Sequence, residues 1–149
     1  MRPLILAAAI AVLPAATFAG DDMIRVKSSH TVAATAGKLA GAAETAGATV
    51  FARVDHGAGA KSVGKDIGES VAVIFGNPAA GTPVMEQNRL AGAILPLQVL
   101  VYQDEDGSVW LAHEDLGGRL ARLDGVDAEG EPVQNLMAAL DRLVQAAAN

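Results

Sequence analysis

The chain has 149 residues, no cysteine and a formal net charge of −6 at neutral pH. The absence of thiols excludes disulfides, thiolate catalysis and thiolate metal sites, and the acidic charge argues against nonspecific binding of nucleic acid or anionic lipid. The length suits one domain built around one hydrophobic core.

A signal peptide is predicted over residues 1–19. Arg2 precedes an apolar run over residues 4–13, and Thr17 and Ala19 provide the small residues of a cleavage site. The apolar run is about half the roughly 20 residues that a membrane-spanning helix needs. We therefore expect cleavage after Ala19 and a periplasmic or secreted mature form without a transmembrane segment.

The first part of the mature chain combines a strand with a helix of small residues. Residues 23–27 alternate apolar and basic side chains, as in an edge or half-buried strand, and Ser28 and Ser29 offer a helix cap. Residues 31–47 predict a helix that depends on tertiary packing, because glycines interrupt it. Its apolar stripe consists of Val32, Ala36, Leu39 and Ala43.

Two strands and a second helix are predicted next. Residues 48–55 alternate with the period of a strand, and residues 71–75 form a continuous apolar run typical of a buried strand. The segment between them is predicted to be a glycine-rich loop. Thr82 and Pro83 have the order of a helix cap and a first-turn proline, so we expect a helix from there to about Leu95.

The last part of the chain predicts a hairpin and two helices. Residues 97–103 and 108–113 flank the turn sequence D-E-D-G, and a short helix is expected over residues 118–123. A longer amphipathic helix begins at about Pro132. Its apolar stripe consists of Val133, Leu136, Met137, Leu140, Leu143 and Val144.

The order of these elements predicts an α+β fold. The sequence β-α-β-β-α-β-β, followed by helices, excludes a purely parallel sheet because hairpins join antiparallel strands. We expect a two-layer sandwich in which helices cover a mixed β-sheet. Residues 20–130 would form the domain, and residues 131–149 would form a helix that packs on the domain or at an interface.

Three segments resemble a known family. They are V-F-A-R-V-D-H-G-A-G-A over residues 50–60, I-F-G-N-P-A-A-G-T-P-V-M over residues 74–85, and L-P-L-Q-V-L-V-Y-Q-D-E-D-G-S-V-W-L over residues 95–111. Together they resemble the domain-of-unknown-function family numbered 302, from Met23 to about Asp124. The resemblance implies a compact two-layer α+β domain that associates as a homodimer, and it implies no particular reaction.

The first candidate site lies at the end of the strand over residues 48–55. Asp55 and His56 precede a glycine-rich segment, where functional groups are often held by a rigid strand. In an enzyme of the hydrolase or isomerase type, His56 would be the general base, Asp55 or Glu86 its partner, and Lys61 a stabiliser of charge. The structural alternative is that His56 only fixes the turn.

The second candidate site is the corner G-N-P-A-A-G-T-P over residues 76–83. Free backbone N–H groups at a helix N-terminus favour a small anionic ligand, with Asn77, Gly81, Thr82 and Asn88 as binding residues. Turn chemistry alone also explains two glycines and two prolines. We expect the turns over residues 56–64 and 76–83 to converge on one side of the molecule.

No metal site or cofactor is assigned from the sequence. The oxygen and nitrogen ligands available are His30, His56, His113, Glu114 and Asp115, and no pair of them has the helical spacing of a zinc site. The favoured function is that of an exported, noncatalytic module that binds a small ligand or another protein. The alternatives are the His56 enzyme, a metal-binding envelope protein, and a larger envelope assembly docked through the C-terminal helix.

Overall fold

The computed structural model describes residues 22–149, so the predicted signal peptide and its cleavage site lie outside the described residues. The elements within this range follow in chain order: β1 (Met23–Ser28), α1 (Val32–Thr45), β2 (Thr49–Asp55), α2 (His56–Ser62), β3 (Ser70–Gly76), α3 (Pro78–Gln87), the 3₁₀ helix η1 (Arg89–Ala93), β4 (Leu97–Gln103), β5 (Val109–Glu114), α4 (Leu116–Leu120) and α5 (Glu131–Ala148).

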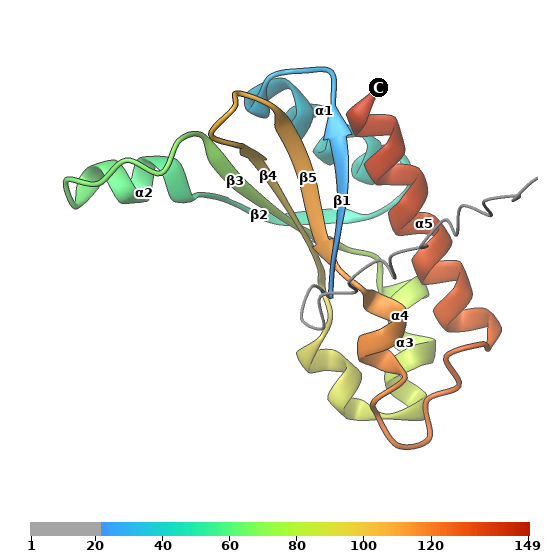
Figure 1. Ribbon diagram of the computed structural model, residues 1–149. Coiled ribbons are helices and arrows are strands. Elements are labelled where there is room, and N and C mark those ends of the chain that lie inside the picture. The colour runs from blue at the N-terminus through green and yellow to red at the C-terminus, as the bar shows by residue number, and fades with distance from the viewer. Residues whose placement is uncertain (1–21) are drawn as a thin grey trace, which may run out of the picture.

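The five strands form one sheet in the order β1-β5-β4-β3-β2 (Figure 1). Every neighbouring pair is antiparallel. The α+β sandwich is therefore confirmed, whereas the expectation of a mixed sheet is wrong. Strands β1 and β2 run in the same direction, as the β-α-β order suggests, but α1 carries the chain between opposite edges of the sheet, so these two strands do not pair.

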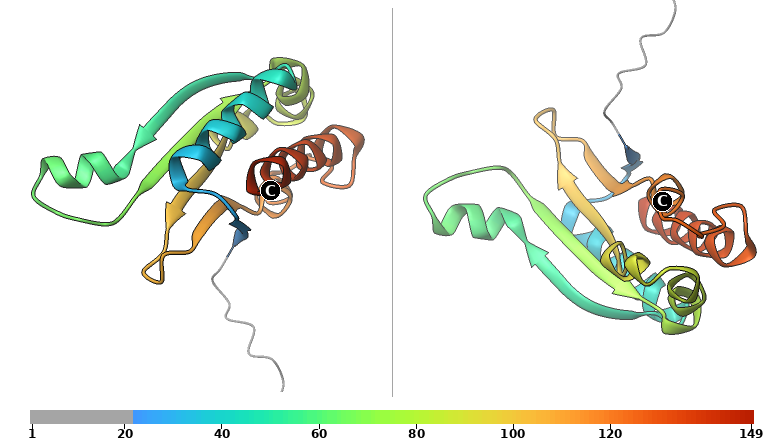
Figure 2. Two further views of the ribbon diagram at one scale, coloured as in Figure 1. Left: turned by 90° about the horizontal axis from the view of Figure 1, so that it is seen from above. Right: turned by 90° about the horizontal axis from the view of Figure 1, so that it is seen from below.

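Helices α1 and α5 cover one face of the sheet (Figure 2). Helix α1 contacts β2, β3 and β4, while α5 contacts β1, β5 and the other helices α1, α3 and α4. The core lies between these layers, and its largest fully buried side chains include Phe75, Leu39, Leu111 and Leu120. None of the described helices crosses the centre of the opposite face (Figure 2).

Helix α1 buries the stripe that the sequence predicts. Val32, Ala36, Leu39 and Ala43 are all buried. The cap is Thr31, whose Oγ1 accepts a hydrogen bond from the Ala34 N–H, rather than Ser28 or Ser29. A hydroxyl side chain of this kind satisfies one of the free N–H groups at a helix start.

Three predictions of local structure in this part of the chain are wrong. The segment expected to be a glycine-rich loop forms α2, because the Asp55 carboxylate caps it. Helix α3 begins at Pro78, because Asn77 and Pro78 already form a cap and a first-turn proline five residues before Thr82 and Pro83. The helix expected to reach Leu95 ends instead at Gln87 and is followed by η1.

Helix α5 packs on its own domain. Val133, Leu136, Leu140 and Val144 are buried in the same core as α1 and the sheet, and Met137 and Leu143 pack partly against it. Before it comes α4, which starts two residues earlier than predicted because Asp115 caps it by accepting the Gly118 N–H.

Candidate functional site

The two candidate turns lie at opposite ends of the β2–β3 hairpin. Asp55 is opposite Val71, next to α2, whereas Thr49 is opposite Gly76, next to α3. Figure 1 shows α2 at the far tip of this hairpin and α3 below the sheet. The expected convergence of the two turns is therefore wrong, because antiparallel pairing places the end of β2 beside the start of β3.

Residues 55–69 form a projecting segment, which we call the arm (Figure 1). Helix α2 packs chiefly on β3, and Gly57 is its one buried residue. The Asp55 Oδ1 accepts a hydrogen bond of 2.7 Å from the Ala58 N–H and so fixes the start of the helix. Val63 and Ile67 remain 72% and 56% exposed, so the arm presents apolar side chains that nothing in the described chain covers.

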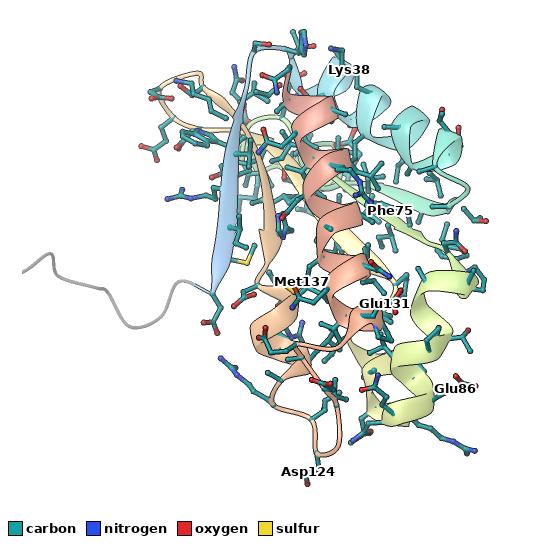
Figure 3. All side chains as sticks on the ribbon, turned by 90° about the vertical axis from the view of Figure 1, so that its right-hand side faces the viewer. Lys38, Phe75, Glu86, Asp124, Glu131 and Met137 are labelled. Atoms are coloured by element: carbon teal, nitrogen blue, oxygen red, sulfur yellow. The ribbon has the colours of Figure 1, made fainter. Side chains whose placement is uncertain are left out.

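The residues of the enzyme hypothesis are divided between two places. Asp55, His56 and Lys61 belong to the arm, where all three are exposed, whereas Glu86 lies on α3 near the lower end of the molecule (Figure 3). Within residues 22–149, no hydrogen bond joins the His56 ring to Asp55, Lys61 or Glu86. The Asp55 carboxylate serves as a helix cap instead of orienting the imidazole.

A groove of about 1040 Å³ lies along the face of the sheet opposite α1 and α5. We call it the trough. The arm walls one end, and residues 93–97 with Leu116 and Arg119 wall the other. The side chains along its floor come from neighbouring strands and are mainly apolar: Val54, Ile74, Leu100 and Ala112.

His113 is buried at the edge of the trough. Its surroundings could not be predicted from the sequence. Its Nδ1 lies 2.9 Å from the Glu114 carbonyl oxygen. Since a carbonyl can only accept, Nδ1 carries the proton. Its Nε2 is buried and has no partner within the described residues.

The corner at the start of α3 has already satisfied its helix donors. Asn77 Oδ1 accepts the Ala79 N–H at 2.9 Å, and the Asn77 carbonyl oxygen accepts the N–H groups of Ala80 and Gly81 at 3.0 Å each. Pro78 has no N–H. An anion at this position would therefore find no free backbone donor in the first turn.

The other two residues of this candidate site lie beyond the first turn of α3. Thr82 lies inside α3 and is exposed. Asn88 uses both ends of its amide, because Oδ1 accepts the Leu90 N–H at 2.8 Å and Nδ2 donates to the Asp124 carbonyl oxygen at 2.9 Å. Asn88 thus caps η1 and fixes the loop before α5.

Beside this corner lies an apolar cavity of about 330 Å³, which we call the corner cavity. It is lined by the ends of β2 and β3, by α3, by residues 95–97 and by α5, and it opens to solvent beside Phe51. Its lining includes Phe51, Met85, Leu136, Ala139 and Leu143, and no lining side chain is ionisable. Sequence reasoning missed this cavity because its walls come from segments far apart in the chain.

The candidate metal ligands are not gathered. His30 Nε2 contacts Lys38 Nζ and the Asn149 carbonyl oxygen near the upper end of the molecule (Figure 3), His56 lies on the arm, and His113 is buried. Within residues 22–149, no group of three or more histidine, aspartate or glutamate side chains could hold a metal ion. Over the same range, no helix is both long enough and apolar enough to cross a membrane.

Comparison with known proteins gives a family and a fold. The family model described as "Domain of unknown function DUF302" matches residues 24–147, a region that includes α5 and extends beyond the Asp124 reached by the sequence resemblance. The crystal structure of an uncharacterized conserved protein DUF302 from Bacillus stearothermophilus is similar with a TM-score of 0.68 and 18% sequence identity, covering 86% of this chain and 96% of that one.

The curated relatives are much longer than the matched region. Proteins named fluoride-specific ion channel FluC 1, from Brucella suis biovar 1 and Brucella abortus biovar 1, are 41% identical over 102 residues. The match covers 68% of this chain but only 40% and 38% of the two relatives. The chain thus spans about two fifths of the length of these relatives.

Proposed function

We propose that this chain, which belongs to the DUF302 family, is an exported, noncatalytic interaction module that pairs with a second copy of itself through the trough. The observation that carries the proposal is the mainly apolar floor of the trough on the uncovered face of the sheet, with the arm standing at its end.

The exposed apolar side chains support an interaction surface. Met23, Val54, Val63 and Ile67 are all substantially exposed, and all four line the trough. Scattered apolar residues are normal on a protein surface, whereas a contiguous apolar groove marks a binding surface. Covering these side chains removes apolar area from water and so stabilises the complex.

The composition of the arm also favours a partner. Helix α2 has seven residues, including Gly57 and Gly59, and only Gly57 is buried. A helix this short is marginal by itself, and each glycine costs about 1 kcal/mol relative to alanine. Contacts with a second molecule would supply the packing that the arm lacks within its own chain.

A second copy suits this surface better than an unrelated partner. A two-fold axis places the same surface of both copies in contact, so one self-complementary patch is covered in each subunit. Arm and trough are parts of one continuous surface, and the trough bears few charges, chiefly Asp55, Glu114 and Arg119 near its ends. The paired residues Glu114 and Arg119 already form an ion pair within one chain, which limits repulsion between copies.

The enzyme and metal-binding alternatives gain no support from the arrangement of the described residues, since Glu86 is remote from His56 and the histidines are dispersed. In the Brucella relatives, a segment 41% identical to this chain is part of a longer protein named as a fluoride-specific ion channel. This arrangement supports a modular role. Export rests on the signal-peptide pattern of residues 1–19.

Sedimentation equilibrium of the purified chain without residues 1–19 tests the pairing. We expect a dimer in the wild type, and we expect Val63→Glu and Ile67→Glu to raise the dimer dissociation constant by at least about 30-fold, the effect of about 2 kcal/mol at an interface. Ala33→Glu, which adds the same charge to the exposed face of α1, is the matched control and should remain dimeric. A monomeric wild type, or dimers unaffected by both arm variants, would contradict the proposal.

A further inference from the structure

We propose that the corner cavity binds a small, neutral, mainly hydrocarbon molecule that carries one hydrogen-bond acceptor. The cavity lies at the opposite end of the β2–β3 hairpin from the arm, and its lining shares only residues 95–97 with the trough, so this site stands apart from the arm contacts of the pairing proposed above.

The size and lining of the cavity set the chemical class of the ligand. A volume of about 330 Å³ lies within the range of small-molecule sites, which is roughly 300–1,000 Å³. Because no lining residue is ionisable, a charged ligand would lose its hydration without gaining a partner. Water in an apolar pocket finds few hydrogen-bond partners, so an apolar ligand that displaces it gains affinity.

Phe51 gives the cavity an aromatic wall that is open to solvent. It lies at the irregularity in the β2–β3 ladder between Val50 and Ala52, on an edge strand. Irregularities of this type re-aim a side chain and often occur beside functional sites. Phe51 is 58% exposed, yet its Cε2 is only 3.3 Å from the position that a Gly76 Cβ would occupy. A bound hydrocarbon would cover the exposed ring.

Asn77 supplies a directional contact, beside the Thr82 hydroxyl, which also lines the cavity. Its Oδ1 is fixed as the acceptor of the Ala79 N–H, so the other end of the amide is Nδ2, a donor. Within the described chain Nδ2 has no hydrogen-bond partner, and Asn77 lines the cavity. This donor fits a hydroxyl, carbonyl or ester oxygen at the end of a hydrocarbon chain.

The neutral fluorophore N-phenyl-1-naphthylamine is a direct probe of the site. It should bind the wild-type chain, and 1-decanol should displace it at a concentration at least about tenfold lower than decanoate, because burying an unpaired carboxylate costs several kcal/mol. Equal displacement by the alcohol and the carboxylate would overturn the neutral ligand class.

Two matched variants on α5 locate the binding. Ala139→Leu fills the cavity, whereas Ala138→Leu places the same side chain on the exposed face of the helix. We expect the probe to bind at least about tenfold more weakly to Ala139→Leu and with wild-type affinity to Ala138→Leu. Equal affinity in both variants would mean adsorption elsewhere and would overturn the site.

Asn77→Asp tests the donor. Aspartate also caps helices, so α3 should remain folded while the Nδ2 donor is lost. The affinity for 1-decanol should fall, and an unchanged affinity would show that Asn77 does not contact the ligand. Repeating the probe titration on Val63→Glu separates this proposal from the pairing, because that variant changes the trough and leaves the cavity lining intact.

Discussion

Asp55 lies opposite Val71 at the last paired position of β2, immediately before α2. This pairing directs the arm away from α3 and from the corner cavity. As a result, the domain has two apolar surfaces that meet at residues 95–97: the trough, which suits another protein, and the corner cavity, which suits a small molecule. Four predictions test local contacts, two of them in the arm and two elsewhere in the fold.

The Asp55 cap should stabilise the arm through its hydrogen bond rather than through its charge. Asp55→Ala removes the acceptor of the Ala58 N–H and should destabilise α2 by about 1 kcal/mol, whereas Asp55→Asn keeps an acceptor and should be close to neutral. Amide hydrogen exchange at residues 57–62 measures the difference. An equal acceleration in the two variants would assign the effect to the charge.

The glycines of α2 should respond oppositely to the same substitution. A Cβ at Gly57 would lie 2.7 Å from the Gly68 carbonyl oxygen, so Gly57→Ala should destabilise the arm by about 1–3 kcal/mol. Gly59 has no such neighbour within 4 Å, and Gly59→Ala should stabilise the helix by about 0.5–1 kcal/mol. Amide exchange at low protein concentration compares them, and matching effects would show that Gly57 is not a point of close approach.

Helix α5 should be part of the folding core. Leu140→Ala should lower the free energy of unfolding by about 2–5 kcal/mol, because it leaves a cavity under a buried side chain. Leu90→Ala, at a residue 64% exposed, should change it by less than about 0.5 kcal/mol. Urea denaturation gives both values. A stable Leu140→Ala chain would favour the alternative in which this helix docks to a larger assembly.

The β4–β5 turn should carry an acid-sensitive contact. The Ser108 backbone N–H donates to Asp106 Oδ1 at 2.8 Å, and this bond holds the pKa of Asp106 below its ordinary value of 3.8. A lowered folded-state pKa stabilises the turn above the unfolded pKa, and this contribution is lost as the pH falls through the folded one. An NMR titration should place the Asp106 midpoint below 3.8, and Asp106→Asn should remove the pH dependence of the Ser108 amide. A midpoint at or above 3.8 would contradict the contact.

Local patterns predicted most elements of the fold. The period-two run predicted β2, the continuous apolar run predicted β3, and the turn sequence D-E-D-G predicted the β4–β5 hairpin. The stripe of Val133, Leu136, Leu140 and Val144 predicted the buried face of α5. Helix α2 was not predicted because its glycines lower the helix propensity. The feature that favours the helix is the Asp55 cap, which is a single hydrogen bond. The start of α3 was misplaced because two cap-and-proline pairs occur five residues apart.

The site was less predictable because it depends on pairing between distant segments. Local apolar patterns identify β2 and β3 but do not say that Gly76 lies opposite Thr49, which separates the two turns. Likewise, the corner was interpreted from its own glycines and prolines, whereas its apolar character comes from Phe51 on β2 and Leu136 and Ala139 on α5. No local pattern brings these residues together.

Concentration-dependent amide hydrogen exchange of the arm is the decisive measurement, since it reports both pairing and its location. If two copies pair through the arm and the trough, exchange at residues 57–63 slows as the wild-type concentration rises through the dimer dissociation constant, while Val63→Glu shows no such slowing. Arm exchange that stays constant while the chain dimerises would place the interface elsewhere and rule out pairing through the trough.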